Sequence, residues 1–329
     1  MGIQGSVRWA AASRRAVLGA AAGLVSAGQA RAQGWPSRPV RIVSPFAPGG
    51  SSDGPARFLA ERLMPVLGQP VVVENRAGAG SLVGTAYVAQ STDGHTLLLG
   101  SMSHVVNPLI HSQISYDPMR DFAPVTLIGA TPVLLVVPAA SPLRSVEDLV
   151  RAGREDGVLT YASAGNGTVN HLAAELFKRR TGARITNVTY RGEGALMPDL
   201  LSGTVSTGFL NMAVPLPLIR EGRLRALATA SPRRLEALPD VPTLAEAGVA
   251  GADVSGWRCI LAAANVPAEG RARLEAALTE ILARLPTRDA LAEMGLLPVP
   301  VGSRYMAEFL RQEAARWREV ILAADIRGD

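Results

Sequence analysis

The stretch SPFAPGGSSDGPAR, from Ser44 to Arg57, separates a short apolar run from a segment with helical periodicity. The preceding run, Val40–Val43, is rich in β-branched residues and predicts a buried strand. The following segment, Arg57–Leu67, repeats its apolar residues at helical spacing and predicts a helix. A loop of glycines, prolines and serines in this position is either a tight turn or a cradle for a small anion.

The same alternation continues along the chain and predicts an α/β fold with largely parallel sheets. The C-terminal stretch Arg271–Ala324 is expected to be helical, with a polar break near Val299–Ser303. Further strands are expected at Val71–Val73, Thr96–Leu99, Val133–Val137, Leu159–Ala162, Ile185–Tyr190, Val205–Leu210 and Leu224–Thr229. Further helices are expected at Leu82–Gln90, His171–Arg180 and Leu196–Leu201.

Length and composition limit the class of protein. A chain of 329 residues normally divides into two domains. Its 48% of hydrophobic and 19% of charged residues exclude a wholly disordered chain. The formal charge of +5 falls to +1 when residues 1–32, which hold four arginines and no acidic residue, are set aside. A nucleic-acid-binding protein should carry a basic stripe, so we expect no nucleic-acid partner.

The N-terminus has the order of an export signal. An arginine-containing segment precedes the apolar run Ala16–Ala27, and Ala30-Arg31-Ala32 forms a small-x-small cleavage site. The apolar run is too short to span a bilayer. We therefore expect a signal peptide over residues 1–32 and a soluble periplasmic chain that begins at Gln33. The segment SRRAVL resembles a twin-arginine signal, and the general secretory route stays open.

Three loops share the order strand, Gly-rich polar loop and helix start. They are the opening stretch, ENRAGAGSLVGTA over Glu74–Ala86, and YASAGNGTVNHLA over Tyr161–Ala173. A helix start presents free backbone N–H groups and the positive end of a dipole, and glycines let the backbone approach a ligand. Thr168 stands where it could cap the third helix. A single loop of this kind is usually only a turn followed by a helix cap, whereas three together suggest a small-anion pocket.

Other chemistries have little support in the sequence. It holds neither a phosphate-binding P-loop motif nor a G-x-S-x-G nucleophile elbow, and the glycines of Gly78–Gly84 are one residue too far apart for a dinucleotide loop. The four histidines lack metal-ligand spacing, and His171 is expected to pack or cap. Cys259 is expected to be a buried, inert thiol. We expect no metal, cofactor or catalytic residue, with a hydrolytic triad using Ser51 and Asp53 as a remote alternative.

Seven motifs carry a family resemblance along the chain. They are RPVRIVSPFAPGGSSD, GQPVVVENRAGAGSLVG, DGHTLLLGS, YDPMRDFAPV, YASAGNGTVNHLAAELF, LRALATASPRR and LPDVPTLAEAG. In this order they resemble the substrate-binding proteins of tripartite tricarboxylate transporters, the Bug receptors. The resemblance runs from about Pro36 to the C-terminus.

The resemblance implies a type II periplasmic binding protein fold, in which two α/β lobes enclose a ligand cleft. Lobe 1 would comprise residues 33–131 and 257–329, and lobe 2 residues 132–256. Two crossing strands would join the lobes. The apolar runs Val133–Val137 and Trp257–Ala264, which have no Gly-rich exit, fit those crossings.

The resemblance also implies which residues contact a carboxylate through backbone amides, hydroxyls and bound water. In the opening loop these are Phe46, Pro48, Gly49, Gly50, Ser51, Ser52 and Asp53. In the second loop they are Ala79, Gly80 and Ser81, and in the third Ser163, Ala164, Gly165, Asn166, Gly167 and Thr168. Arg191 stands where the family usually has lysine, and Phe209 would lie near the cleft. Asn211 and His104 are secondary candidates.

The function implied is that of a monomeric receptor without catalytic turnover. It would capture a small organic acid by closure of the lobes and present it to a membrane permease. An orphan sensor that feeds a two-component kinase uses the same fold, so it stays open as an alternative. A periplasmic hydrolase is the remote alternative. The export signal argues against the effector domain of a transcription regulator.

Overall fold

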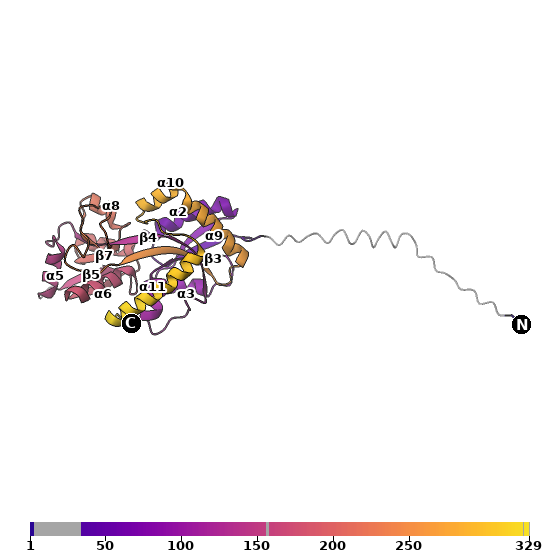
Figure 1. Ribbon diagram of the computed structural model, residues 1–329, viewed down its shortest axis with the longest axis horizontal. Helices are drawn as coiled ribbons and strands as arrows, with labels where there is room; N and C mark the ends of the chain where they lie inside the picture. The colour runs from indigo at the N-terminus through magenta and orange to yellow at the C-terminus, as the bar shows by residue number, and fades with distance from the viewer. Residues whose placement is uncertain (3–33, 156–157, 325, 329) are drawn as a thin grey trace.

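A computed structural model describes residues 1–2, 34–155, 158–324 and 326–328 (Figure 1). The predicted signal peptide and its cleavage site near Ala32 lie almost entirely outside these residues. No helix in the described part of the chain combines the length and the apolar composition that crossing a bilayer requires.

The first lobe is built on a five-stranded sheet with the order β2-β1-β3-β9-β4. The opening strand β1 pairs in parallel with β2 and β3, and β9 pairs antiparallel with β3 and β4. The strands are β1 (Val40–Ser44), β2 (Val71–Asn75), β3 (Thr96–Ser101), β4 (Phe122–Pro138) and β9 (Ser255–Ala263).

The second lobe continues the sheet through β4, in the order β4-β7-β5-β6, with β8 also paired to β4. Its strands are β5 (Leu159–Ser163), β6 (Ile185–Thr189), β7 (Thr207–Asn211) and β8 (Leu224–Thr229). The parallel strands β5 and β6 end in the loops that lead to helices α6 and α7, as the βα alternation predicts.

Strand β4 passes from one lobe to the other. It pairs with β9 as far as Pro132, opposite Ser255, and with β7 and β8 from Val133 onward. The chain returns just before β9, where the Val254 N–H donates to the Ala230 carbonyl. Strand β4 contains the expected run Val133–Val137, whereas the return segment lies just before the expected run Trp257–Ala264, which pairs within the first lobe.

Helices cover the faces of both halves of the sheet (Figure 1). In the first lobe they are α2 (Asp53–Leu67), the 3₁₀ turn η1 (Ala79–Ser81), α3 (Leu82–Ala89), α4 (Ser103–Ile110), α9 (Ala268–Ala283) and α10 (Leu285–Glu293). In the second lobe they are α5 (Val146–Arg154), α6 (Val169–Thr181), α7 (Glu193–Ser202) and α8 (Pro215–Arg220). The last helix, α11 (Ser303–Ala324), contacts both α4 and α6 and so spans the two lobes.

Three elements differ from the sequence-based expectation. Helix α2 begins at Asp53 and includes Pro55, whose missing N–H would have no partner in a first turn anyway. Strand β4 is 17 residues long, because Pro124 is accommodated beside a register shift. Helix α4 was not expected from the sequence; it is only eight residues long and contains Pro108.

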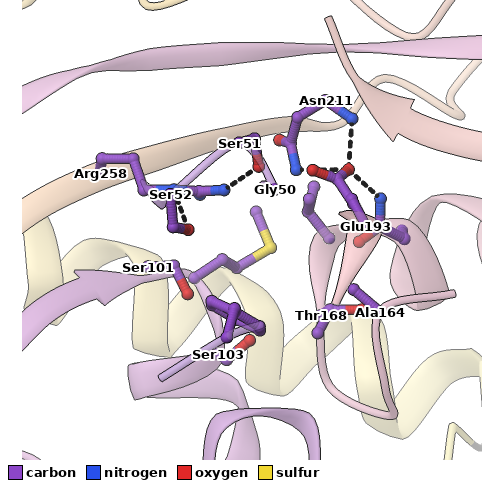
Figure 2. Close-up of a pocket in the computed structure, with 14 residues that line it drawn as sticks. Gly50, Ser51, Ser52, Ser101, Ser103, Ala164, Thr168, Glu193, Asn211 and Arg258 are labelled. Carbon is purple, nitrogen blue, oxygen red and sulfur yellow. Dashed lines mark hydrogen bonds between the residues drawn. The ribbon is translucent and has the colours of Figure 1, made fainter. Parts of the chain in front are cut away.

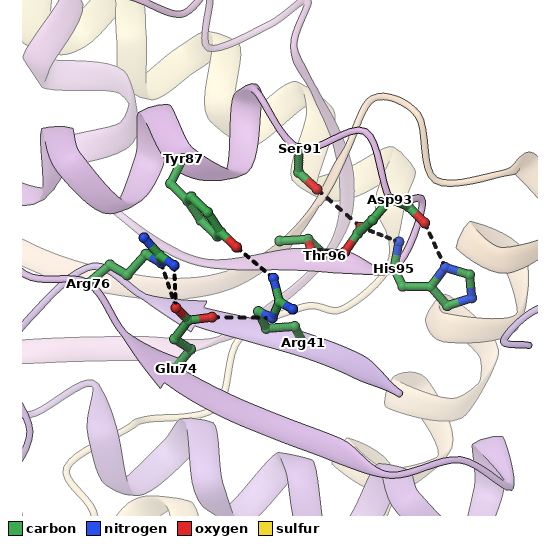
Figure 3. Close-up of polar contacts among 8 residues, drawn as sticks. All are labelled: Arg41, Glu74, Arg76, Tyr87, Ser91, Asp93, His95 and Thr96. Carbon is green, nitrogen blue, oxygen red and sulfur yellow. Dashed lines mark hydrogen bonds and ion pairs between the residues drawn. The ribbon is translucent and has the colours of Figure 1, made fainter. Parts of the chain in front are cut away.

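A polar network fixes α3 against the first sheet (Figure 3). Glu74 on β2 accepts hydrogen bonds from Arg76 and pairs with Arg41 on β1. Arg41 also donates to the Tyr87 hydroxyl of α3 at 2.6 Å, and the Arg76 guanidinium lies over the Tyr87 ring. These contacts link α3 to two strands of the first sheet through charged and polar groups.

His104, His171 and Cys259 are buried in the interior. His104 packs against Tyr116 and Phe122, with ring centroids 4.7 Å apart for the Phe122 pair. Burial lowers the pKa of His104 and of His171 to about 4, although each has a partner that opposes the shift. Cys259 is fully buried and burial raises its thiol pKa, which confirms the inert thiol.

Lowering the pH from 7 to 5 should destabilise the protein, although these pH values lie above the ordinary pKa of carboxylates. His104 and His171 are neutral in the folded protein at pH 5, whereas their pKa is near 6.5 in the unfolded chain. As the pH falls, the unfolded chain therefore binds more protons than the folded protein and is favoured. Between pH 7 and pH 5 each should remove about 2 kcal/mol from the free energy of unfolding. Urea titrations at both pH values should show a smaller loss for His104→Gln than for the wild type. An equal loss would contradict a neutral buried His104.

Candidate functional site: a closed cavity between the lobes

A cavity of about 360 Å³, counting its opening, lies between the lobes at the ends of several strands (Figure 2). Six of the residues predicted as ligand contacts line it: Phe46, Gly50, Ser51, Ser52, Ala164 and Thr168. The secondary candidate Asn211 also lines it. Seven lining residues were not predicted: Ser101, Met102, Ser103, Val169, Asn170, Glu193 and Arg258.

The first lobe contributes a buried cation, Arg258 of β9. Its side chain donates to Ser51 Oγ at 2.8 Å through Nη2 and to Ser52 Oγ at 3.1 Å through Nε. The third donor, Nη1, bonds the Trp257 carbonyl. Burial lowers the pKa of Arg258, whereas the negative charge of Glu193 opposes that shift. Because each serine oxygen accepts from the guanidinium, each hydroxyl hydrogen stays available to donate to an anion.

The second lobe contributes a buried anion, Glu193, at the start of α7. Its Oε1 atom accepts three hydrogen bonds, from Asn170 Nδ2 at 2.8 Å, the Asn211 N–H at 2.7 Å and Asn211 Nδ2 at 2.9 Å. The residue is only 3% exposed. A first-turn position favours a negative charge, because the positive end of the helix dipole lies there.

Two helix starts also face the cavity. Helix α2 begins directly after Ser52, and α6 begins directly after Thr168. The predicted cap is wrong in its chemistry, since the Thr168 hydroxyl donates to the Gly165 carbonyl at 2.6 Å and accepts no cap bond. The N–H groups of the first turn of α6 are therefore not occupied by that side chain.

The second and third Gly-rich loops meet across the cleft. A Cβ on Gly80 would overlap the Asn166 carbonyl oxygen, and a Cβ on Gly165 would lie 2.6 Å from the Gly80 Cα. Gly80 has a φ of 58° and Gly165 of 120°, so both also need backbone shapes that favour glycine. The neighbouring Asn107 side chain of α4 donates to the Gly80 carbonyl and to Ser81 Oγ. The two lobes therefore meet on this side of the cavity.

Several predicted contacts therefore lie in this closing contact and not on the cavity wall. Ala79, Gly80 and Ser81 form the first-lobe side of it. Gly165, Asn166 and Gly167 form the second-lobe side, and Asn166 Nδ2 donates to the Gly328 carbonyl at 2.7 Å. Pro48 and Gly49 touch Gly194 in a second contact between the lobes, and the Ala47 N–H donates to the Arg191 carbonyl there.

Four other predicted residues do not line the cavity and contact other parts of the protein instead. Asp53 pairs with Arg57 at 3.0 Å and accepts from Asn75 Nδ2, and these bonds outweigh burial and hold the Asp53 pKa below its ordinary value. Ser163 is buried behind the wall. The other two are away from the cavity, since Arg191 has an exposed side chain and Phe209 packs against Phe177 in the core.

The remaining titratable groups are not part of the wall. His104 bonds the Pro118 carbonyl at 2.9 Å from the far side of α4, and His171 Nδ1 accepts from the Gly167 N–H. Within the described ranges no group of three or more histidine, cysteine, aspartate or glutamate side chains is arranged to hold a metal ion.

The missed residues had partial signals in the sequence. Arg258 is a lone charge in the apolar run WRCILAAA, and a charge on a buried strand requires partners. Ser101 and Ser103 follow an expected strand, as the other loop serines do. Glu193 carries no signal of its own, because a first-turn glutamate is ordinary on a solvated helix.

Comparison with known proteins identifies the family. Residues 55–326 match the tripartite tricarboxylate transporter family receptor. The chain belongs to this receptor family. It is 38% identical to the protein BugT of Bordetella pertussis over 291 residues, which cover 87% of this chain and 89% of BugT.

Solved structures of similar sequence agree with the fold. A protein of R. palustris solved with adipate is 35% identical, with a TM-score of 0.85 over 89% of this chain and 99% of that one. MatC from Rhodopseudomonas palustris with bound malate is 32% identical, with a TM-score of 0.83 over 87% of this chain and 100% of that one. The predicted Bug-receptor family and the two-lobed type II periplasmic binding fold are confirmed.

Removal of the buried cation should destabilise this receptor. Arg258→Leu leaves Ser51 Oγ, Ser52 Oγ and the Trp257 carbonyl without their donor and removes the positive charge across the cavity from Glu193, so the free energy of unfolding should fall by about 3 kcal/mol. Arg311→Leu is the control, because Arg311 is an exposed cation paired with Glu308 on α11. Urea unfolding should leave the control near the wild type. Equal stability of both variants would show that Arg258 is not needed to balance the cavity.

Proposed function

We propose that this chain is a periplasmic solute-binding receptor that captures a small carboxylate by closure of its lobes. Its lobes would comprise residues 33–131 with 257–329 and residues 132–256, as the change of strand partners at Pro132 and Val133 supports. Cleavage near Ala32 would release the exported chain into the periplasm. The receptor would act without catalytic turnover and would deliver its ligand to a tripartite tricarboxylate-type permease.

The observation that carries the proposal is the donor set on one wall of the closed cavity. Arg258 supplies a positive charge, Ser51 and Ser52 supply hydroxyl hydrogens, and the start of α2 adds the positive end of a helix dipole. The start of α6 faces the same space from the other lobe. This set suits a carboxylate, and relatives with bound adipate and malate support it.

Delivery of the ligand to a permease is tested in cells. Cells that lack the gene for this chain should lose uptake of the labelled acid that the chain binds.

A thermal-shift screen tests the binding. The mature chain, unfolded and refolded to remove any carried ligand, would be mixed with succinate, malate, adipate, citrate, benzoate, nicotinate and a set of amino acids. An acid at 100 times its Kd should stabilise the fold by about 2.7 kcal/mol, a rise of several degrees in Tm. Ser51→Ala combined with Ser52→Ala should abolish the rise, because the two serines supply the hydroxyl donors of this wall. No rise with any acid would contradict the proposal.

Closure can be tested separately from the binding wall. Gly80→Ala should prevent the lobes from meeting, because its Cβ would overlap the Asn166 carbonyl oxygen. Gly203→Ala is a matched control: its φ of 79° imposes similar backbone strain, but nothing lies within 4 Å of the added Cβ. The acid that stabilises the wild type should raise the Tm of the control and not of Gly80→Ala. An equal rise in both would show that binding does not require this contact.

A further inference from the structure

The cavity contains two buried acceptor atoms that no group of the described protein satisfies. They are Glu193 Oε2 and Asn211 Oδ1. The partners of both side chains are already assigned, because Asn170 Nδ2 and Asn211 Nδ2 both donate to Glu193 Oε1. These bonds fix the carboxylate with Oε1 toward the second lobe. A buried carboxylate oxygen without a donor is costly, so it calls for a partner that the protein alone does not supply.

The cation on the opposite wall does not supply that partner. Arg258 directs its guanidinium to Ser51, Ser52 and the Trp257 carbonyl, and no ion pair within 4.0 Å joins it to Glu193 among the described residues. Figure 2 shows Arg258 with its two serines on one side and Glu193 with Asn211 on the other. The cavity therefore separates a buried positive group from a buried negative group.

The charges of the wall define what fits between them. Arg258 and Glu193 are the two ionisable side chains among its 14 lining residues, so the wall is neutral as a whole. A dicarboxylate would bring two negative charges and would place one of them near Glu193. A molecule with one carboxylate and one ammonium group would match both ends and keep the closed site neutral.

We propose that the ligand is a small amino acid in its zwitterionic form. The carboxylate would lie toward Ser51, Ser52 and Arg258, and the ammonium would donate to Glu193 Oε2 and Asn211 Oδ1. The free space between the walls is only about 20 Å³, so the lobes would have to part to admit even a compact molecule. The inference rests on the proposed receptor function and makes Glu193 the residue that determines specificity.

Matched ligand pairs test the inference on the refolded wild type. Calorimetry would compare L-alanine with propionate, γ-aminobutyrate with butyrate, and L-aspartate with succinate, since each pair differs only by an ammonium group. In the pair that fits the cavity, the amino member should bind at least 100-fold more tightly. Carboxylates that bind with no preference for the amino member would overturn the zwitterion inference and leave the receptor function intact. Binding of no acid of either kind would overturn both.

The variant Glu193→Gln tests whether Glu193 causes the preference for an amino acid over the matching simple acid. It keeps an oxygen that can accept the three bonds now made to Oε1, and it replaces the unsatisfied oxygen by an NH₂ donor. The amino acid should lose at least tenfold in affinity, and the paired simple acid should gain affinity. Glu175→Gln on α6 is the control, because Glu175 pairs with Lys178 and does not line the cavity. An unchanged preference in a folded Glu193→Gln protein would overturn the assignment.

Discussion

A charge buried on a strand must be given partners, and the organisation of this receptor depends on how Arg258 receives them. The guanidinium is 4% exposed and takes two of its acceptors from adjacent serines of the opening loop. These bonds tie the loop after β1 to β9, so the start of α2 is held at one place beside the cavity. The same cation balances Glu193 from across the cleft. One side chain therefore links the loop, strand β9 and the charge of the second lobe.

The need to satisfy polar groups also explains the rest of the wall. Glu193 would be costly to bury alone, and Asn170 and Asn211 orient it through one of its two oxygens. Both asparagines are buried and belong to different elements, α6 and β7. The second lobe thus holds its anion by a network within that lobe, as the first lobe holds its cation. Each wall can form before the lobes meet.

The sequence predicted the fold well because periodicity reports on local structure. The strands after Val40 and Leu159 and the helices after both loops have the expected kind and nearly the expected bounds. Predictions failed where long-range packing decides the outcome. Strand β4 crosses both sheets through prolines that look like strand breakers, and α4 contains Pro108, which looks like a helix breaker. The spacing of apolar residues along the sequence does not reveal either constraint.

The site was predictable only in part, for the same reason. The loops were found because glycine-rich helix starts are local features, and Ser51, Ser52 and Thr168 do reach the wall. Glu193 and Arg258 were missed because their meaning depends on residues distant in the chain. Ser52 and Arg258 are 206 positions apart. The pattern also does not separate a glycine that faces a ligand from one that faces another loop, as the positions of Gly50 and Gly80 illustrate.

The contact of Gly80 with Gly165 limits how closely the two lobes can approach one another. Main chain meets main chain there, with no side chain that could yield or repack. The closest approach of the lobes is therefore fixed by two glycines, because packed backbone has no rotamer to change. A methyl group at either glycine would set a wider limit, whatever side chains stand on the cavity wall.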